Sequence, residues 1–95
     1  MSYQIGDRVG AIASADDETV RLYGYGVYLG EEVPPPGIQL WGLDLHELGH
    51  KNPMIQLDGA KIVWGCECWW GPEVKIKQII GHRKVTWVDI GEARS

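Results

Sequence analysis

Apolar and polar residues alternate along three stretches of this chain, a pattern that is typical of β-strands with one buried face. The alternation predicts strands over residues 7–14, 19–29 and 83–90. The middle stretch gathers small and apolar side chains on one face, which comprises Val20, Leu22, Gly24, Gly26 and Tyr28. Two glycines on one face leave room for another body to approach the backbone. That body is either a tryptophan side chain from the 63–70 stretch or a ligand.

The stretch V-W-G-C-E-C-W-W-G-P-E, residues 63–73, holds three of the five tryptophans and both cysteines. Asp58-Gly59 lies between two apolar runs and predicts a two-residue hairpin that pairs residues 54–57 with 60–69. As a strand, this stretch would present Trp64, Cys66, Cys68 and Trp70 on one face and Val63, Gly65, Glu67 and Trp69 on the other. A strand that is apolar on both sides belongs in the centre of a small sheet or barrel.

Helical signals are confined to two short segments. Pro72 at a first helical position and Gly81 after the last apolar residue predict a helix over residues 72–80. Mixed apolar spacing predicts a second short helix over residues 40–48 that ends at Gly49. We therefore expect a mainly β, five-stranded, SH3-like bent sheet or partly open barrel with one or two short helices. The length allows a single domain that spans all 95 residues.

The composition argues against a nucleic-acid-binding or membrane protein. A formal charge of −4 disfavours binding of long nucleic acids, because neutralising phosphates requires a basic surface. No apolar run approaches the ~18 residues of a membrane span, and the first residues lack the basic start of a signal peptide. Cys66 and Cys68 cannot easily bridge each other within one strand, so we expect free thiols in a reducing cytoplasm.

The pentapeptide H-E-L-G-H, residues 46–50, fits the pattern H-E-x-x-H. On a helix, His46 and His50 could share a zinc ion while the glutamate acts as a general base. The flanking sequence argues against a zinc peptidase, because the metzincin continuation would need Gly and His where this chain has Pro53 and Gln56. Plain surface histidines are therefore expected, and a zinc hydrolase with His46 and His50 as metal ligands stays an alternative.

Aromatic residues define the candidate ligand site. Five tryptophans and four tyrosines, with no phenylalanine, suit half-buried positions at binding sites. Indole and phenol faces stack on a nucleobase, a carboxylate accepts from a base edge or ribose hydroxyl, and an arginine pairs with a phosphate. We predict that the base stacks on Tyr23, Tyr25, Trp69 and Trp70. Glu67 is the predicted hydrogen-bond acceptor, and Arg21 or Arg83 is predicted to pair with a phosphate. For each tryptophan, the alternative is packing in the core or in a dimer.

Four segments resemble a group of short uncharacterised proteins from phages and bacteria. These segments are G-D-R-V-G-A-I (6–12), G-Y-G-V-Y-x-G (24–30), N-P-M-I-x-L-D (52–58) and V-W-G-C-E-C-W-W-G-P-E (63–73). The resemblance covers most of the chain except residues 37–51, and it implies that these are a variable insertion. The small size, β-rich build and aromatic content are similar in kind to those of phage-encoded sponge proteins, which sequester nucleotide immune signals. No functional residue is carried over from this similarity.

The sequence thus predicts a non-enzymatic protein, without a cofactor, that holds a small nucleotide-like ligand in an aromatic pocket. As a phage-encoded sponge it would sequester a host immune signal in the bacterial cytoplasm. One alternative is an SH3-like module that grips a peptide or partner protein, and the other is the zinc hydrolase. A tryptophan-rich exposed face on so thin a core also predicts a homo-oligomer. No membrane partner is expected.

Overall fold

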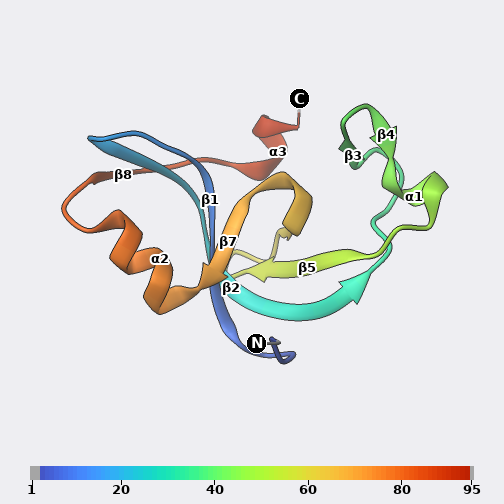
Figure 1. Cartoon of the computed structure of the whole chain (residues 1–95), viewed down its shortest axis with the longest axis horizontal. Coiled ribbons are helices and arrows are strands. Elements are labelled where there is room, and N and C mark those ends of the chain that lie inside the picture. The colour runs from blue at the N-terminus through green and yellow to red at the C-terminus, as the bar shows by residue number, and fades with distance from the viewer. Residues whose placement is uncertain (1–2, 95) are drawn as a thin grey trace.

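The computed structural model describes residues 3–94 as a bent, mostly antiparallel six-stranded sheet, a small two-stranded sheet and three short α-helices (Figure 1). Five strands follow one another in the order β6-β5-β2-β1-β7, and β8 pairs with β2 beside this path. Their bounds are β1 Arg8–Ala15, β2 Thr19–Glu32, β5 Asn52–Leu57, β6 Ile62–Trp64, β7 Trp69–Pro72 and β8 Lys84–Trp87. Within these residues β6 and β7 do not pair with each other, so the sheet stays open. The prediction of a mainly β, bent sheet with short helices is confirmed.

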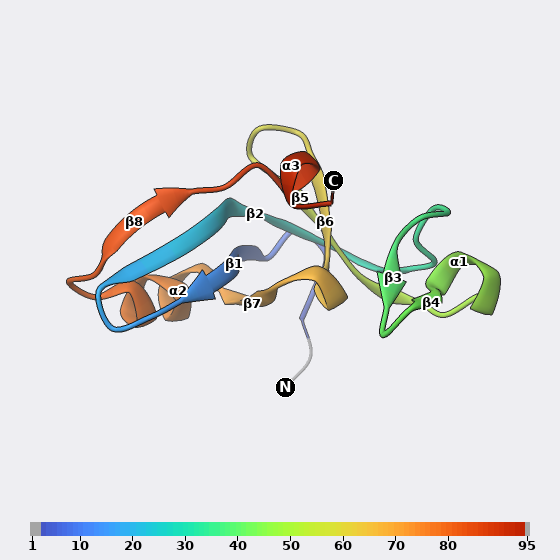
Figure 2. The ribbon, with the colours of Figure 1, turned by 90° about the horizontal axis from the view of Figure 1, so that it is seen from above.

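The sheet is organised around β2, whose 14 residues run along most of the molecule (Figure 2). One edge of β2 pairs with β1 over residues 20–27. The other edge pairs first with β8, over Thr19–Leu22, and then with β5, over Gly26–Glu32. Residues 23–25 lie between these two partners. This edge of β2 therefore has a gap in its pairing, and the candidate site described below lies at that gap.

The alternation predicted for β2 is confirmed, because all five residues of the small and apolar face are buried. The body that approaches its two glycines is β5. A Cβ atom on Gly26 would lie 2.0 Å from the backbone oxygen of Gln56, and one on Gly24 would lie 3.6 Å from the side chain of Leu57. The expectation of an indole packed on these glycines was wrong. Glycine is needed at position 26 because the neighbouring backbone occupies the place of a side chain.

The stretch 63–73 is not a single strand, so the predicted alternation of its faces was wrong. After β6 the chain makes a 3-10 turn over Gly65–Glu67 and enters β7, which lies at the opposite edge of the sheet. Gly65 permits this turn, because a Cβ atom there would come within 2.8 Å of the Pro53 ring. The N–H of Cys66 donates to the side-chain oxygen of Asn52 at 2.9 Å and fixes the turn on β5.

β5 and β6 form the hairpin that Asp58-Gly59 predicts. Its loop has three residues rather than two. Ala60 adopts the left-handed conformation that closes such a loop, with a φ of 78°. Its N–H donates to the carbonyl of Leu57 at 2.8 Å. The position of the hairpin was therefore predicted correctly, and only its turn type differs.

One helix follows β7 and another follows β8. α2 spans Glu73–Ile80, begins one residue later than predicted and ends at Gly81 as predicted. β8 is shorter than the strand predicted there, because the side chain of Asp89 caps the third helix, α3 Ile90–Ala93. α3 was not predicted from the sequence.

Residues 37–49 form an arm at one end of the molecule (Figures 1 and 2). The arm consists of β3 Gln39–Leu40, β4 Leu43–Asp44 and α1 Leu45–Leu48. The helix predicted over residues 40–48 is thus confirmed only for its last turn, which ends at Gly49 with a φ of 63°. Ile38 and Leu45 are buried with Trp64 of β6 in one apolar cluster, which fixes the arm to the sheet.

Two further apolar clusters hold the sheet to its helices. The larger consists of Val9, Ala11, Tyr28, Ile55, Leu57, Val63 and Ile90. The second joins β1 and β2 to α2 through Ile12, Val20, Leu22 and Ile76. Both cysteines are free thiols, as expected. None of the helices within residues 3–94 has the length and apolar character needed to cross a membrane.

Candidate functional site

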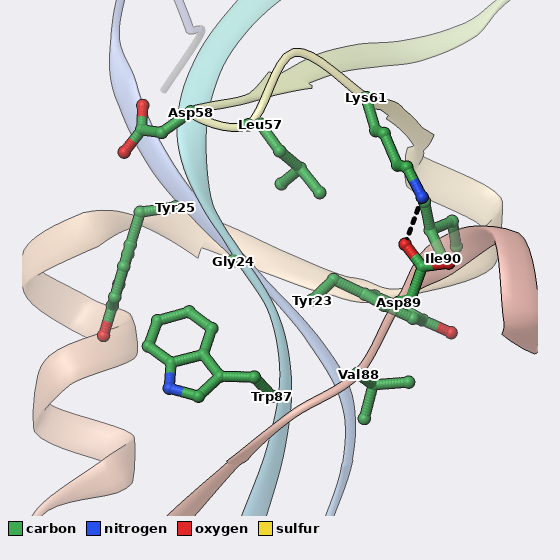
Figure 3. Close-up of a pocket in the computed structure, with 11 residues that line it drawn as sticks. Tyr23, Gly24, Tyr25, Leu57, Asp58, Lys61, Trp87, Val88, Asp89 and Ile90 are labelled. Carbon is green, nitrogen blue, oxygen red and sulfur yellow. Dashed lines mark hydrogen bonds and ion pairs between the residues drawn. The ribbon is translucent and has the colours of Figure 1, made fainter.

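A pocket of about 410 Å³ opens at the gap in the pairing of β2 (Figure 3). Gly24, which has no side chain to fill the space, lies at its centre. On one side of the gap, the N–H of Val88 donates to the carbonyl of Leu22 at 2.9 Å. On the other side, the N–H of Asp58 donates to the carbonyl of Tyr25, also at 2.9 Å. The neighbouring chain segments are thus fastened to β2 on both sides, and the hollow between them is built into the sheet.

One wall of the pocket is aromatic. Tyr25 of β2 and Trp87 of β8 meet edge to face, with ring centroids 6.4 Å apart and planes at 73°. The quadrupoles of aromatic rings favour this arrangement. Trp87 keeps 64% of its surface exposed, so much of its indole is open to a ligand. Tyr23 lies across the hollow, on the side of Ile90 (Figure 3).

The two tyrosines of the pocket carry neutral phenols at physiological pH. Burial raises the pKa of Tyr25, and the charge of Glu73 raises it further. Burial also raises the pKa of Tyr23, with a further contribution from Glu67. The ammonium group of Lys77 lies 5.5 Å from the centroid of the Tyr25 ring, a cation–π contact that steadies this ring. Each phenol can therefore offer a planar apolar face and a hydrogen-bond donor.

Charged side chains of both signs stand at the mouth of the pocket. The ammonium group of Lys61 donates to the carboxylate of Asp89, and this hydrogen bond holds the pKa of Asp89 below its usual range. At the opposite side, Arg8 donates to Asp58 at 2.7 Å and to Glu73 at 3.1 Å. The bond from Arg8 likewise lowers the pKa of Asp58. Lys61 lines the pocket and carries a positive charge, so its ammonium group is available to bind an anionic group of a ligand.

The structure brings two of the predicted stacking residues together, Tyr23 and Tyr25, and both line the pocket. Arg21 lies two positions before Tyr23 on the same, more exposed face of β2. It stands beside the pocket and is not one of its lining residues. These three residues alternate along one strand, which is why their shared face could be predicted.

Trp70 and Glu67 do not belong to the pocket. The partly buried Trp70 ring packs against the core and stacks on Tyr28, with centroids 5.6 Å apart and planes at 7°. The carboxylate of Glu67 accepts two hydrogen bonds from the guanidinium of Arg94, both at 2.6 Å, and its side chain is only 13% exposed. It also accepts from the N–H of Trp64 at 3.0 Å. Glu67 therefore secures the 3-10 turn, and the structure does not bring it together with Tyr23 and Tyr25.

Trp69 and Arg83 lie elsewhere on the molecule. Trp69 is 79% exposed, at the edge of a different groove between β7 and α2. Arg83 donates to the carbonyl of Ile79 and thereby satisfies a backbone acceptor at the end of α2. Neither residue lines the pocket at the gap of β2. The structure therefore does not bring these two residues together with Tyr23 and Tyr25. Trp69 lies apart because the 3-10 turn leads the chain to the opposite edge of the sheet.

The H-E-L-G-H segment does not present its two histidines from one helical face. α1 ends at Leu48, and Gly49 turns the chain into the left-handed conformation before His50. Nδ1 of His46 lies 3.1 Å from the carbonyl oxygen of Pro34. Within residues 3–94, no three His, Cys, Asp or Glu side chains gather closely enough to hold a metal ion. The helical spacing that would align two ligands is therefore not formed.

Nine of the eleven residues that line the pocket were not predicted from the sequence, among them Lys61, Trp87 and Asp89. The alternation of Val85, Trp87 and Asp89 was visible and marked a strand, but its partner was not. β8 pairs with β2 in parallel, from Thr19↔Lys84 to Leu22↔Trp87, and parallel pairing over so long a separation leaves no local signal.

Comparison of this chain with protein-family models, with curated proteins and with solved structures found no match.

Proposed function

We propose that this protein binds a small nucleotide-like ligand, without transforming it, in the pocket at the gap of β2. The observation that supports this proposal most strongly is the open aromatic pair of Tyr25 and Trp87 beside the empty space over Gly24. A planar base suits this space, because aromatic faces stack on bases whatever their hydrogen-bonding pattern.

In this proposal the base lies against the indole of Trp87, with Tyr23 on the far side of the hollow. The phenol of Tyr25 or Tyr23 donates a hydrogen bond to the base or the ribose. Lys61 turns from Asp89 to the phosphate, since an ammonium group binds phosphate as a point charge. Arg21, further along the same face of β2, meets a second phosphate or a longer ligand.

The resemblance to short phage and bacterial proteins suggests a purpose for such binding. A small protein that holds a nucleotide without consuming it lowers the free concentration of that nucleotide. We propose that the chain acts in this way, as a phage-encoded sponge that withholds a nucleotide immune signal from its receptor in the host cytoplasm.

The proposal is tested by equilibrium titration with a panel of mono-, di- and cyclic nucleotides, followed by tryptophan fluorescence and calorimetry. Trp87→Ala should weaken binding about 5- to 150-fold, the equivalent of about 1–3 kcal/mol for one stacked base. Trp69→Ala is the matched control, because it removes another exposed indole outside the pocket. Equal losses in both variants, or no binding of any nucleotide by the wild type, would contradict the proposal.

A further inference from the structure

An indole stands fully in solvent at the tip of the arm. Trp41 is 90% exposed and occupies the two-residue turn between β3 and β4. Its φ is 54°, and that of the next residue, Gly42, is 78°. Hairpin turns with two positive φ angles favour Asn, Asp and Gly. At a positive φ the Cβ atom of most other residues comes too close to the following carbonyl oxygen. The chain thus tolerates local strain at the position where it presents a tryptophan to its surroundings.

The arm holds this indole away from the rest of the molecule. Ile38 and Leu45 anchor its base on Trp64, and its tip extends beyond the sheet (Figure 2). Two further apolar side chains of the arm, Leu43 and Leu48, are also exposed. An anchored hairpin with exposed apolar side chains has the features of an interface element, since buried aromatic anchors dominate the energetics of protein interfaces.

A groove suited to such a side chain lies on the other half of the molecule. It has a volume of about 770 Å³ and lies between the end of β1, β7 and the side of α2 that carries Ile76 and Ile79. β7 pairs with β1 only as far as Ile12↔Trp69, so residues 13–15 of β1 extend beyond it with small side chains. Trp69 and Ile79, the latter 48% exposed, stand at this groove. We name it the β7–α2 groove.

The arm and α2, at opposite ends of the molecule, lie in segments of opposite net charge. The arm and the segment that leads into and out of it, residues 31–51, carry Glu31, Glu32, Asp44 and Glu47 against Lys51, a net charge of −3. The segment of α2 and the turn after it, residues 73–84, carries Lys75, Lys77, Arg83 and Lys84 against Glu73, a net charge of +3. Complementary charge speeds encounter and fixes the orientation of two surfaces.

We propose that the arm of one copy of this chain inserts Trp41 into the β7–α2 groove of a second copy. The molecule is 41 Å long, and Figure 1 places the arm and α2 at opposite ends, so Trp41 cannot reach the groove of its own chain. The contact is head to tail and joins different surfaces of the two copies. Such contacts close into a ring or continue as an open chain of copies. This inference does not depend on nucleotide binding, because the pocket at the gap of β2 uses other residues.

The test is the oligomeric state in solution, measured by sedimentation and light scattering on the whole chain. Trp41→Gly removes the indole and suits the positive φ, while Ile79→Glu places a charge at the groove. We expect the wild type to assemble at low salt and dissociate as salt rises, and each variant alone to be monomeric. An equal mixture of the two variants should form dimers, because it contains one intact groove and one intact arm.

Three outcomes would overturn the proposal. They are a monomeric wild type at concentrations up to about 1 mM, variants that still assemble, or a mixture that remains monomeric. Circular dichroism of each variant shows whether it is folded. Trp69→Ala serves as a second groove variant if Ile79→Glu does not fold, and it should likewise pair with Trp41→Gly.

Discussion

Tyr25 and Trp87 meet edge to face at 6.4 Å, although one lies in the second strand and the other in the last. The contact exists because β8 runs parallel to β2 and leaves it at Leu22, one residue before the gap in the edge. Trp87 is the last residue of β8 and therefore stands over the opening. The same strand arrangement that leaves the hollow also supplies the aromatic ring that covers part of it.

The close approach of β5 to β2 predicts that Gly26 tolerates no side chain. A Cβ atom would lie 2.0 Å from the backbone oxygen of Gln56, and backbone cannot move as a side-chain tip can. We expect Gly26→Ala to lower the free energy of unfolding by about 3 kcal/mol or more. Gly59→Ala is the control, because no atom lies within 4 Å of its Cβ position, and we expect a change within about 0.5 kcal/mol. Urea unfolding measures the stability of both variants. Equal losses of stability in the two variants would show that β2 and β5 do not approach each other this closely at Gly26.

The arm should lose stability in acid through Asp44. The pKa of Asp44 is lowered chiefly by the N–H of Gly37, which it accepts at 3.1 Å, and then by the N–H groups of His46 and Glu47. A carboxyl whose pKa is lower in the folded state stabilises the fold above its unfolded pKa of about 4. That contribution is lost as the pH falls through the folded pKa.

We therefore expect Asp44→Asn to reduce the urea midpoint at pH 7 and to have little effect near pH 2. Asp17→Asn is the control, since the Asp17 side chain is exposed and the neighbouring Asp16 is the one that accepts the N–H groups of this turn. It should change the midpoint little at either pH. A loss from Asp44→Asn that is the same at both pH values would show that the carboxylate charge does not matter.

The two thiols should react slowly in the folded protein. Burial raises the pKa of Cys68 to about 12, with Glu67 and Cys66 adding to the effect, and burial also raises the pKa of Cys66. The thiolate is the reactive form, so alkylation by iodoacetamide at pH 8 should be slower than in urea-unfolded protein. Cys66→Ser and Cys68→Ser report on each thiol separately, and we expect Cys68 to be the slower. Fast labelling of Cys68 in folded protein would place it in a different environment.

The interrupted helix at residues 45–48 predicts that H-E-L-G-H does not bind zinc tightly. His50 follows the left-handed Gly49 and is not one helical turn above His46. Protein purified without added metal should contain well below one zinc per chain. His46→Ala should leave this content unchanged. Stoichiometric zinc in the wild type that disappears in His46→Ala would restore the hydrolase alternative.

The local features of this fold could be predicted from the sequence. The alternation in β2, the hairpin at Asp58-Gly59 and the helix stop at Gly81 each depend on residues close in the chain. The turn at Gly65–Glu67 could not, because it depends on Pro53 and Asn52 of another strand. Because apolar residues lie on both sides of that turn, the sequence pattern resembles that of one continuous strand.

Of the seven residues predicted for the site, two line the pocket, for the same reason. Tyr23 and Tyr25 were identified because they alternate on one strand with Arg21. Glu67 pairs with Arg94, which directly follows the unpredicted helix α3, and the pairing of β8 with β2 could not be predicted either. Roles that depend on such non-local partners cannot be assigned from spacing alone.

Binding of a nucleotide in the pocket over Gly24 is tested most directly by an amide-resolved NMR titration. The ligand is the nucleotide that binds most tightly in the panel. We expect shifts concentrated at the amides of Gly24, Gly59 and Val88, which belong to the residues around the pocket. Residues 13–15, at the β7–α2 groove, should stay unchanged at fixed protein concentration. Shifts confined to that groove, or scattered without a centre, would contradict the claim.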